Sequence, residues 1–178
     1  YGLCGGMSAG ALDFFLLNRP IPVASDIPAN GTPIQRYLYQ RQIDSFGTLG
    51  SALLRFVEMM GLPDGTLQGT QKITSDEFTN NVKPHLDKYT PVPIGLLYQK
   101  WSDTHEIWQN HQVLAYHYET APNGTLRISV CDPNYPARDD IVIEAVPQNV
   151  GAGATGLQCI QRIGQNETKK LYAFFAMP

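Results

Sequence analysis

Three residues of this 178-residue sequence have the types and surroundings of a nucleophilic site: Cys4, His111 and Asp132. Cys4 lies directly before a run of apolar residues with helical spacing. If a helix begins near Gly5, its unpaired N–H groups and the positive end of its dipole favour the thiolate of Cys4. The thiolate is the nucleophilic form of cysteine, and a nearby imidazole is the usual base. These residue types therefore predict attack of a thiolate on a carbonyl carbon.

Each of these residues also has a simpler interpretation. A free cysteine is commonly a small buried apolar residue. A histidine at the start of a strand can be satisfied by a backbone carbonyl, and an aspartate before Pro133 is a common way to open a turn. Taken singly, each residue fits these interpretations. Only the combination of the three favours a Cys-His-Asp site.

The segment between His111 and Asp132 must bring these two side chains together. It holds Asn123 and Gly124 between two runs of alternating apolar residues, a pattern typical of a β-hairpin. Counted outward from this turn, His111 and Asp132 lie nearly opposite each other at the open end of the hairpin. Directly paired Cβ atoms stand roughly 4.5–5.5 Å apart, so a carboxylate at this position can hold an imidazole ring. The sequence therefore predicts a hydrogen bond between them.

The remaining pattern predicts helices in the first half of the chain and an antiparallel sheet in the second half. We expect four helices, which begin near Gly5, at Pro33 behind a Thr32 cap, at Thr48 or Ser51, and behind a Ser75 cap. A proline-rich stretch, 18–32, is expected to be an extended connection. Strands are expected over residues 92–98, 111–119, 125–132, 141–146, 157–163 and 171–177. The chain is predicted to be a single α+β domain, 1–178, with a helical lobe over 1–90 and a sheet lobe over 91–178.

The composition limits the classes of protein to which the chain can belong. Hydrophobic residues make up 43% and charged residues 16%, as in a globular protein. The net charge is −3 without a basic block, and no apolar run reaches the roughly 20 residues of a membrane helix, so neither a nucleic-acid partner nor a membrane span is expected. The histidines and cysteines lack metal-ligand spacing, so no metal or other cofactor is expected. We expect ordinary surface or strand roles for His85, His105 and His117.

The cysteines and the termini leave several points open. Either Cys131 and Cys159 form a disulfide and Cys4 stays free, or all three cysteines are free thiols. Three Asn-X-Ser/Thr triplets and the low charge lean towards a secreted protein, but the localisation stays open. A chain that opens at Tyr1 without an initiator methionine is expected to have been cut from a longer one, and the presence of additional domains upstream stays open.

Three motifs together resemble a known fold. They are Cys-Gly-Gly-x-Ser on the first helix, a histidine followed by alternating apolar residues, and a strand that ends in Asp-Pro. The chain resembles the papain-like cysteine peptidases, and among them the C39-like branch, which is similar to bacteriocin-processing peptidases. The resemblance covers the layout of the whole chain and these three motifs in detail. It implies Cys4 as nucleophile, His111 as general base and acid, and Asp132 as the group that orients His111.

This resemblance also implies the activity and the kind of substrate. We expect a thiol peptidase or amidohydrolase that acts on a peptide or protein, with Gly5, Gly6, Trp108 and Asn110 as residues of the substrate cleft. Papain-like peptidases usually place a glutamine a few residues before the cysteine, whereas only three residues precede Cys4 here. The ATP-binding transporter portion of bacteriocin peptidases is not in this sequence. The alternatives are a non-catalytic papain-like binding module, or a deamidase, transglutaminase or acyltransferase on the same scaffold.

Overall fold

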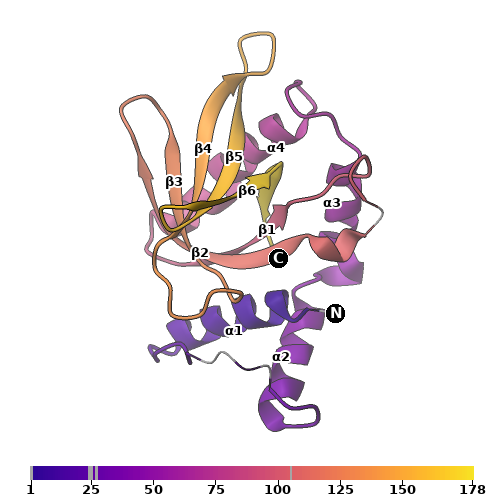
Figure 1. The fold of residues 1–178 in the computed structure, drawn as a ribbon, viewed down its shortest axis with the longest axis vertical. Helices are drawn as coiled ribbons and strands as arrows, with labels where there is room; N and C mark the ends of the chain where they lie inside the picture. Colours follow the sequence, from indigo (N-terminus) through magenta and orange to yellow (C-terminus); the bar gives the residue numbers. More distant parts are fainter. Residues whose placement is uncertain (1, 24–25, 27, 105) are drawn as a thin grey trace.

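The computed structural model describes residues 2–23, 26, 28–104 and 106–178. It confirms an α+β fold, with the helices mainly in the first half of the chain and an antiparallel sheet in the second (Figure 1). The helices are α1 (Cys4–Leu16), α2 (Pro33–Asp44), η1 (Thr48–Gly50), α3 (Ser51–Met60), α4 (Thr70–Glu77), η2 (Phe78–Val82), α5 (Lys83–Leu86) and η3 (Ile107–Gln109). The strands are β1 (Val92–Leu97), β2 (His111–Thr120), β3 (Leu126–Cys131), β4 (Ile141–Asn149), β5 (Thr155–Ile163), β6 (Glu167–Leu171) and β7 (Ala173–Ala176).

Some of the sequence predictions fall outside the part of the chain that the structure describes. The predicted surface or strand role of His105 is one of these. Tyr1, the first residue of the sequence, also lies outside the described residues. Residues 24, 25 and 27 of the predicted extended connection also lie outside the described residues. Within the described residues, no helix combines the length and the apolar character needed to cross a membrane.

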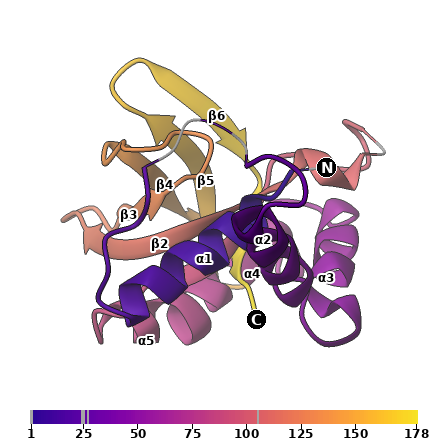
Figure 2. The same ribbon diagram turned by 90° about the horizontal axis from the view of Figure 1, so that it is seen from below.

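Helix α1 lies against both α2 and strand β2, and this packing fixes the end of α1 that carries Cys4 (Figure 2). The Gly6 N–H donates to Gln42 Oε1 at 3.0 Å. A Cβ on Gly6 would lie 2.0 Å from the backbone oxygen of Leu38, so only glycine permits this approach of the two helices. The Ser8 hydroxyl donates to the backbone oxygen of Gln112 at 3.1 Å. The first turns of α1 are therefore attached to β2 next to His111.

The predicted helix starts are confirmed at α2 and α3 but not at the fourth helix. Thr32 caps α2, because its hydroxyl oxygen accepts the Gln35 N–H at 3.3 Å. The predicted cap at Ser75 is wrong, since α4 begins five residues earlier, at Thr70. The helical path then widens into the π-helical segment η2, and Pro84 follows in the first turn of α5. In a first turn the missing N–H of proline costs nothing, so the chain stays helical through this proline.

The seven strands form one sheet in the order β6-β5-β4-β3-β2-β1-β7. Strands β6 and β7 lie at opposite edges of this order, although only Tyr172 separates them in the chain. The sheet must therefore curl until its two edges come close together. Its inward side chains form the larger apolar core, which η2 and α5 cover with Phe78, Val82 and Leu86. A smaller core lies between α3 and the other face of β1 and β7.

The prediction of a single strand over 171–177 is wrong. Leu171 ends β6 and Ala173 begins β7, so this apolar run belongs to two strands. Strand β6 escaped the sequence analysis because it consists mainly of polar residues, Glu-Thr-Lys-Lys-Leu. An edge strand exposed to water needs no apolar alternation, and such strands are often charged. The other five predicted strands are present, with ends that differ by a few residues.

The predicted hairpin of β2 and β3 is confirmed. Gly124 adopts a positive φ of 83°, and its N–H donates to the Ala121 oxygen at 2.8 Å. The strands pair antiparallel up to Leu114 opposite Cys131, with a shift in register between Ala115 and His117. Extending this register by one position places Asp132 opposite Val113, so His111 is its diagonal neighbour on the same face. Diagonal neighbours are within reach of long side chains.

Candidate active site

Cys4, His111 and Asp132 come together at one end of the curled sheet. His111 is the first inward-facing residue of β2. Asp132 comes directly after β3 and continues the inward-facing alternation that includes Val130. His111 is 6% exposed and Asp132 is 1% exposed, so both polar side chains lie in a dry environment. Buried polar groups of this kind need hydrogen-bond partners.

The predicted hydrogen bond between His111 and Asp132 is confirmed. His111 Nε2 lies 2.7 Å from Asp132 Oδ1, which also accepts the backbone N–H of Asn134 at 2.9 Å. The second carboxylate oxygen, Oδ2, accepts a hydrogen bond from Gln161 Nε2 at 2.9 Å. The side-chain nitrogen Nδ2 of Asn134 also lies 3.3 Å from His111 Nε2. Both oxygens of the buried carboxylate are therefore satisfied, and one of them is aimed at the imidazole.

Cys4 is the first residue of α1 and is half-buried. Its thiol and the His111 imidazole lie close enough for each to shift the pKa of the other. Because Nε2 of His111 is engaged by Asp132, Nδ1 is the ring nitrogen left for the sulfur. The backbone N–H groups of Gln112 and Gly5 also face this thiol closely enough to lower its pKa. The imidazole thus lies between a thiol on one side and a carboxylate on the other.

The charges of Cys4 and His111 stabilise each other. Burial alone would raise the pKa of the Cys4 thiol, but the hydrogen bond and charge of His111, together with the N–H groups of Gln112 and Gly5, outweigh it and lower this pKa. Burial alone would lower the pKa of His111, yet hydrogen bonds and charges of Asp132 and Cys4 raise it to about 9. Each charge therefore stabilises the other, and the arrangement makes the thiolate–imidazolium form of the pair more accessible.

The carboxylate of Asp132 supplies the negative charge behind His111. Its burial opposes ionisation, but the hydrogen bond and charge of His111 and the donors Asn134 N–H and Gln161 hold the pKa of Asp132 below its usual range. The carboxylate is therefore ionised at neutral pH. This fixed charge keeps the imidazole protonated and turned with Nε2 away from the sulfur.

The two other cysteines have a different character. All three cysteines are free, so the disulfide between Cys131 and Cys159 that the sequence left open is not formed. Burial and the charge of Asp132 raise the pKa of the Cys131 thiol. Burial also raises the pKa of the Cys159 thiol, which lies in the apolar core. Only the thiol of Cys4 has a lowered pKa among the three.

Gly5 and Gly6, which the resemblance places in the substrate cleft, are closely packed in the structure. Both glycines are buried. A Cβ on Gly5 would lie 2.4 Å from Ser45 Oγ and 2.5 Å from Gln112 Oε1, and the space beside Gly6 is filled by α2. These two glycines allow the start of α1 to pack against its neighbours. Their role in this structure is therefore close packing behind Cys4.

Asn110 and Trp108 differ in their positions. The Asn110 side chain accepts the N–H groups of Tyr98 and Gln99 at 2.9 and 3.1 Å, and it donates to the Ile107 oxygen at 3.1 Å. Its amide therefore ties the segment before β2 to the end of β1, a structural role that the sequence did not predict. Trp108 is 57% exposed on η3, three residues before His111.

Two residues of the site, Gln161 and Asn134, do not follow from the sequence motifs. Gln161 was not singled out, and Asn134 was not connected with His111. Gln161 occupies an inward-facing position of β5 between Cys159 and Ile163, where the alternation otherwise contains apolar residues. The sequence does contain a signal for Gln161, because a polar residue stands there at a position where the alternation predicts a core residue.

A largely apolar groove of about 470 Å³ lies beside α1, and Asp132 is among its lining residues. Met7, Ser8 and Ala11 line it from α1, and Pro133 lines it from the loop after β3. Ser8 lies one helical turn from Cys4, so the groove approaches the site along the helix. None of the four predicted cleft residues lines it.

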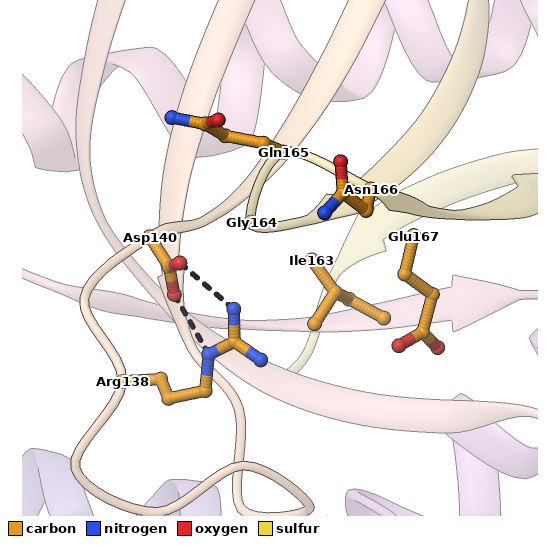
Figure 3. Close-up of a pocket in the computed structure, with 7 residues that line it drawn as sticks. All are labelled: Arg138, Asp140, Ile163, Gly164, Gln165, Asn166 and Glu167. Carbon is orange, nitrogen blue, oxygen red and sulfur yellow. Dashed lines mark hydrogen bonds and ion pairs between the residues drawn. The ribbon is translucent and has the colours of Figure 1, made fainter.

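A second hollow lies away from the site, where the turn between β5 and β6 faces the loop before β4 (Figure 3). Its lining residues are Arg138, Asp140, Ile163, Gly164, Gln165, Asn166 and Glu167. Arg138 donates two hydrogen bonds of 2.8 Å to the Asp140 carboxylate, so its charge is already neutralised. None of these lining residues is one that the sequence predicts for a site.

Searches for metal clusters and for related proteins give negative results. Among the residues that the structure describes, no group of three or more His, Cys, Asp or Glu side chains could hold a metal ion. No protein-family model, curated protein or solved structure matches the chain. The case for a function therefore rests on the residues of this chain alone.

Proposed function

We propose that the chain is a cysteine-dependent acyl-transfer enzyme, a papain-like thiol peptidase or amidohydrolase of the C39-like kind. Two observations carry this proposal: the hydrogen bond between His111 and the buried Asp132 carboxylate, and the mutual pKa effects of the Cys4 thiol and the His111 imidazole. The pKa of Cys4 is lowered while that of His111 is raised to about 9. Shifts of this size and direction are typical of functional sites.

The first half of the reaction uses the charge pair directly. The thiolate of Cys4 attacks the carbonyl carbon of the substrate, and a C–S bond forms while the carbonyl oxygen takes the negative charge. The tetrahedral intermediate collapses when the C–N bond breaks. The His111 imidazolium gives its proton to the departing amine, and a thioester on Cys4 and a neutral imidazole remain.

The second half regenerates the enzyme. The neutral His111 imidazole takes a proton from water, and the oxygen of that water attacks the thioester carbonyl. The C–S bond breaks, the acid is released, and the thiolate–imidazolium pair forms again. Asp132 keeps its charge throughout and holds Nε2 of His111, so Nδ1 always faces the sulfur.

The start of α1 supports the developing oxyanion. The first N–H groups of a helix have no acceptor within the helix and carry partial positive charge. Here the Gly6 N–H is taken by Gln42, and the Gly5 N–H contributes to the lowered pKa of the Cys4 thiol. We assign the Cys4 N–H to the oxyanion, since donors fixed in advance are worth most where charge develops.

The same residues could also serve the alternatives named above, and the acceptor of the acyl group separates them. A hydrolase releases a free acid and a new amine, a deamidase releases ammonia, and a transglutaminase or acyltransferase needs a second nucleophile. A pure binding module needs neither the thiolate nor the buried carboxylate. The paired pKa shifts of Cys4 and His111 support the catalytic alternatives over the binding module.

Acyl-enzyme formation tests this proposal. The protein is mixed rapidly with p-nitrophenyl acetate, and intact mass and peptide mapping then locate the acetyl group. We expect a burst of p-nitrophenol close to one equivalent, with the acetyl group on Cys4, and cleavage of some members of a random peptide library. Cys4→Ala should abolish both, whereas Cys131→Ala should keep the burst. If no burst occurs, or if Cys4→Ala keeps it, the chain is not the proposed enzyme.

A further inference from the structure

Gln161 is a buried amide whose position is set by two polar neighbours. It is 0% exposed and lies on the inner face of the curled sheet, among side chains of the larger core. Its Nε2 donates to Asp132 Oδ2 at 2.9 Å, and its Oε1 accepts a hydrogen bond from the Tyr98 hydroxyl. An amide buried in apolar surroundings costs free energy unless its atoms are paired, and here both ends are paired.

The orientation of this amide follows from its partners. The oxygen of Asp132 can only accept hydrogen bonds, because the carboxylate is ionised. The Gln161 nitrogen must therefore face Asp132, and its oxygen must face the Tyr98 hydroxyl. A reversed amide would place two oxygens with partial or full negative charge against each other in a dry environment. The amide thus fixes the second oxygen of the carboxylate while His111 binds the first.

Tyr98 extends the arrangement back to His111. It directly follows β1, and its ring lies nearly parallel to the imidazole, with the two centroids 6.2 Å apart and an angle of 18° between the planes. The contacts therefore form a closed circuit from His111 to Asp132, Gln161, Tyr98 and back to His111. The imidazole is held at its edge by the carboxylate and on its face by the tyrosine. Four different strands or their ends, β1, β2, β3 and β5, contribute to it.

From this circuit we infer that Gln161, supported by Tyr98, is a positioning residue for the proposed acyl-transfer reaction: it holds Asp132 in the orientation that keeps the imidazole of His111 aligned with Cys4. This inference rests on the proposed function. Gln161 does not touch the sulfur, so its effect reaches the reaction through Asp132. The titratable groups that face the circuit are Cys4 on α1, Lys169 on β6, and Cys131 and Tyr135 on either side of Asp132.

The test compares two substitutions of Gln161 with a control on the same strand. Gln161→Met keeps the length of the side chain and removes the donor, and Gln161→Glu places an acid next to Asp132. Gln158→Met is the control, because Gln158 is exposed on β5. For each protein, kcat and KM for p-nitrophenyl acetate and the rate of Cys4 alkylation by iodoacetamide are measured across pH, with circular dichroism to confirm the fold.

We expect Gln161→Met to lower kcat about 10-fold or more with little change in KM, since a hydrogen bond to a charged group contributes this much. In the plot of Cys4 alkylation rate against pH, the acid limb of this variant should move to higher pH, which narrows the pH range of fast alkylation. In Gln161→Glu a protonated acid can still donate to Asp132, whereas a carboxylate repels it. The activity of this variant relative to the wild type should therefore fall as the pH rises. Tyr98→Phe should show a smaller loss of the same kind.

The outcomes separate this inference from the proposed function. If wild-type Cys4 is alkylated no faster at pH 6 than a free cysteine, the proposed function fails. If the wild type reacts fast and folded Gln161→Met has the wild-type kcat and the wild-type limbs, Gln161 is only a structural residue. Equal loss at every pH in Gln161→Glu would also contradict the positioning role. Gln158→Met should match the wild type throughout.

Discussion

His111→Ala should lower kcat/KM by about 10⁴- to 10⁶-fold, the range found when the base of a catalytic triad is removed. Two effects add in this variant. The hydrogen bond and charge that lower the pKa of Cys4 disappear, so burial dominates and the thiol is protonated at neutral pH. The leaving amine also loses its proton donor. Ester turnover and the rate of Cys4 alkylation at pH 6 measure the two effects separately.

His117→Ala is the matched control for this variant. His117 lies on the same strand, β2, but its side chain is exposed. We expect wild-type turnover and wild-type alkylation from it. His111→Gln is a second substitution that fills more of the space and still removes the base, in case the alanine variant folds poorly. If either folded variant of His111 keeps fast alkylation at pH 6, the charge pair is not the source of the reactivity of Cys4.

Asp132→Asn should lower kcat by about 10⁴-fold while the shape of the site changes little, as expected for the orienting acid of a triad. The variant loses the charge that raises the pKa of His111 to about 9. That pKa should therefore fall, and the imidazolium should be lost at a lower pH. The alkaline limb of the pH–rate profile should move down from near pH 9. Asparagine also presents either an N–H group to His111 or an oxygen, and neither anchors the ring like the carboxylate.

Asp139→Asn provides the comparison for Asp132. Asp139 lies in the loop after β3, as Asp132 does, but it is exposed. We expect its substitution to leave both the rate and the alkaline limb unchanged. An alkaline limb that stays in place in Asp132→Asn would mean that the carboxylate does not control the charge of His111.

The contact between His111 and Asp132 could be predicted because it depends on local sequence. The two residues are separated by a short hairpin, and Asn123 and Gly124 define its turn. Alternating apolar residues then fix which side chains share a face. Even so, the structure places the pair diagonally and not directly opposite. The shift in register near Ala115 is one irregularity that counting outward from the turn does not include.

The position of Gln161 could not be predicted in the same way. It reaches Asp132 only because the sheet curls, and the curl follows from the short connection at Tyr172 between two opposite edges. The sequence does not reveal this connection, because β6 is polar and the apolar run around Tyr172 has the pattern of one strand. Helix α4 was likewise placed too late, because no side chain caps its start after Gly69. Long-range closure, not local pattern, decides these parts of the fold.

The pH dependence of Cys4 alkylation in the wild-type protein shows whether Cys4 and His111 form a thiolate–imidazolium pair. Iodoacetamide reacts with the thiolate, and peptide mapping assigns the label to each of the three cysteines. We predict fast labelling of Cys4 already at pH 6, well below the pKa of about 8.5 of a free cysteine, with Cys131 and Cys159 labelled slowly. A Cys4 rate that rises only with a pKa near or above that value, or earlier labelling of Cys131, would contradict the thiolate–imidazolium pair.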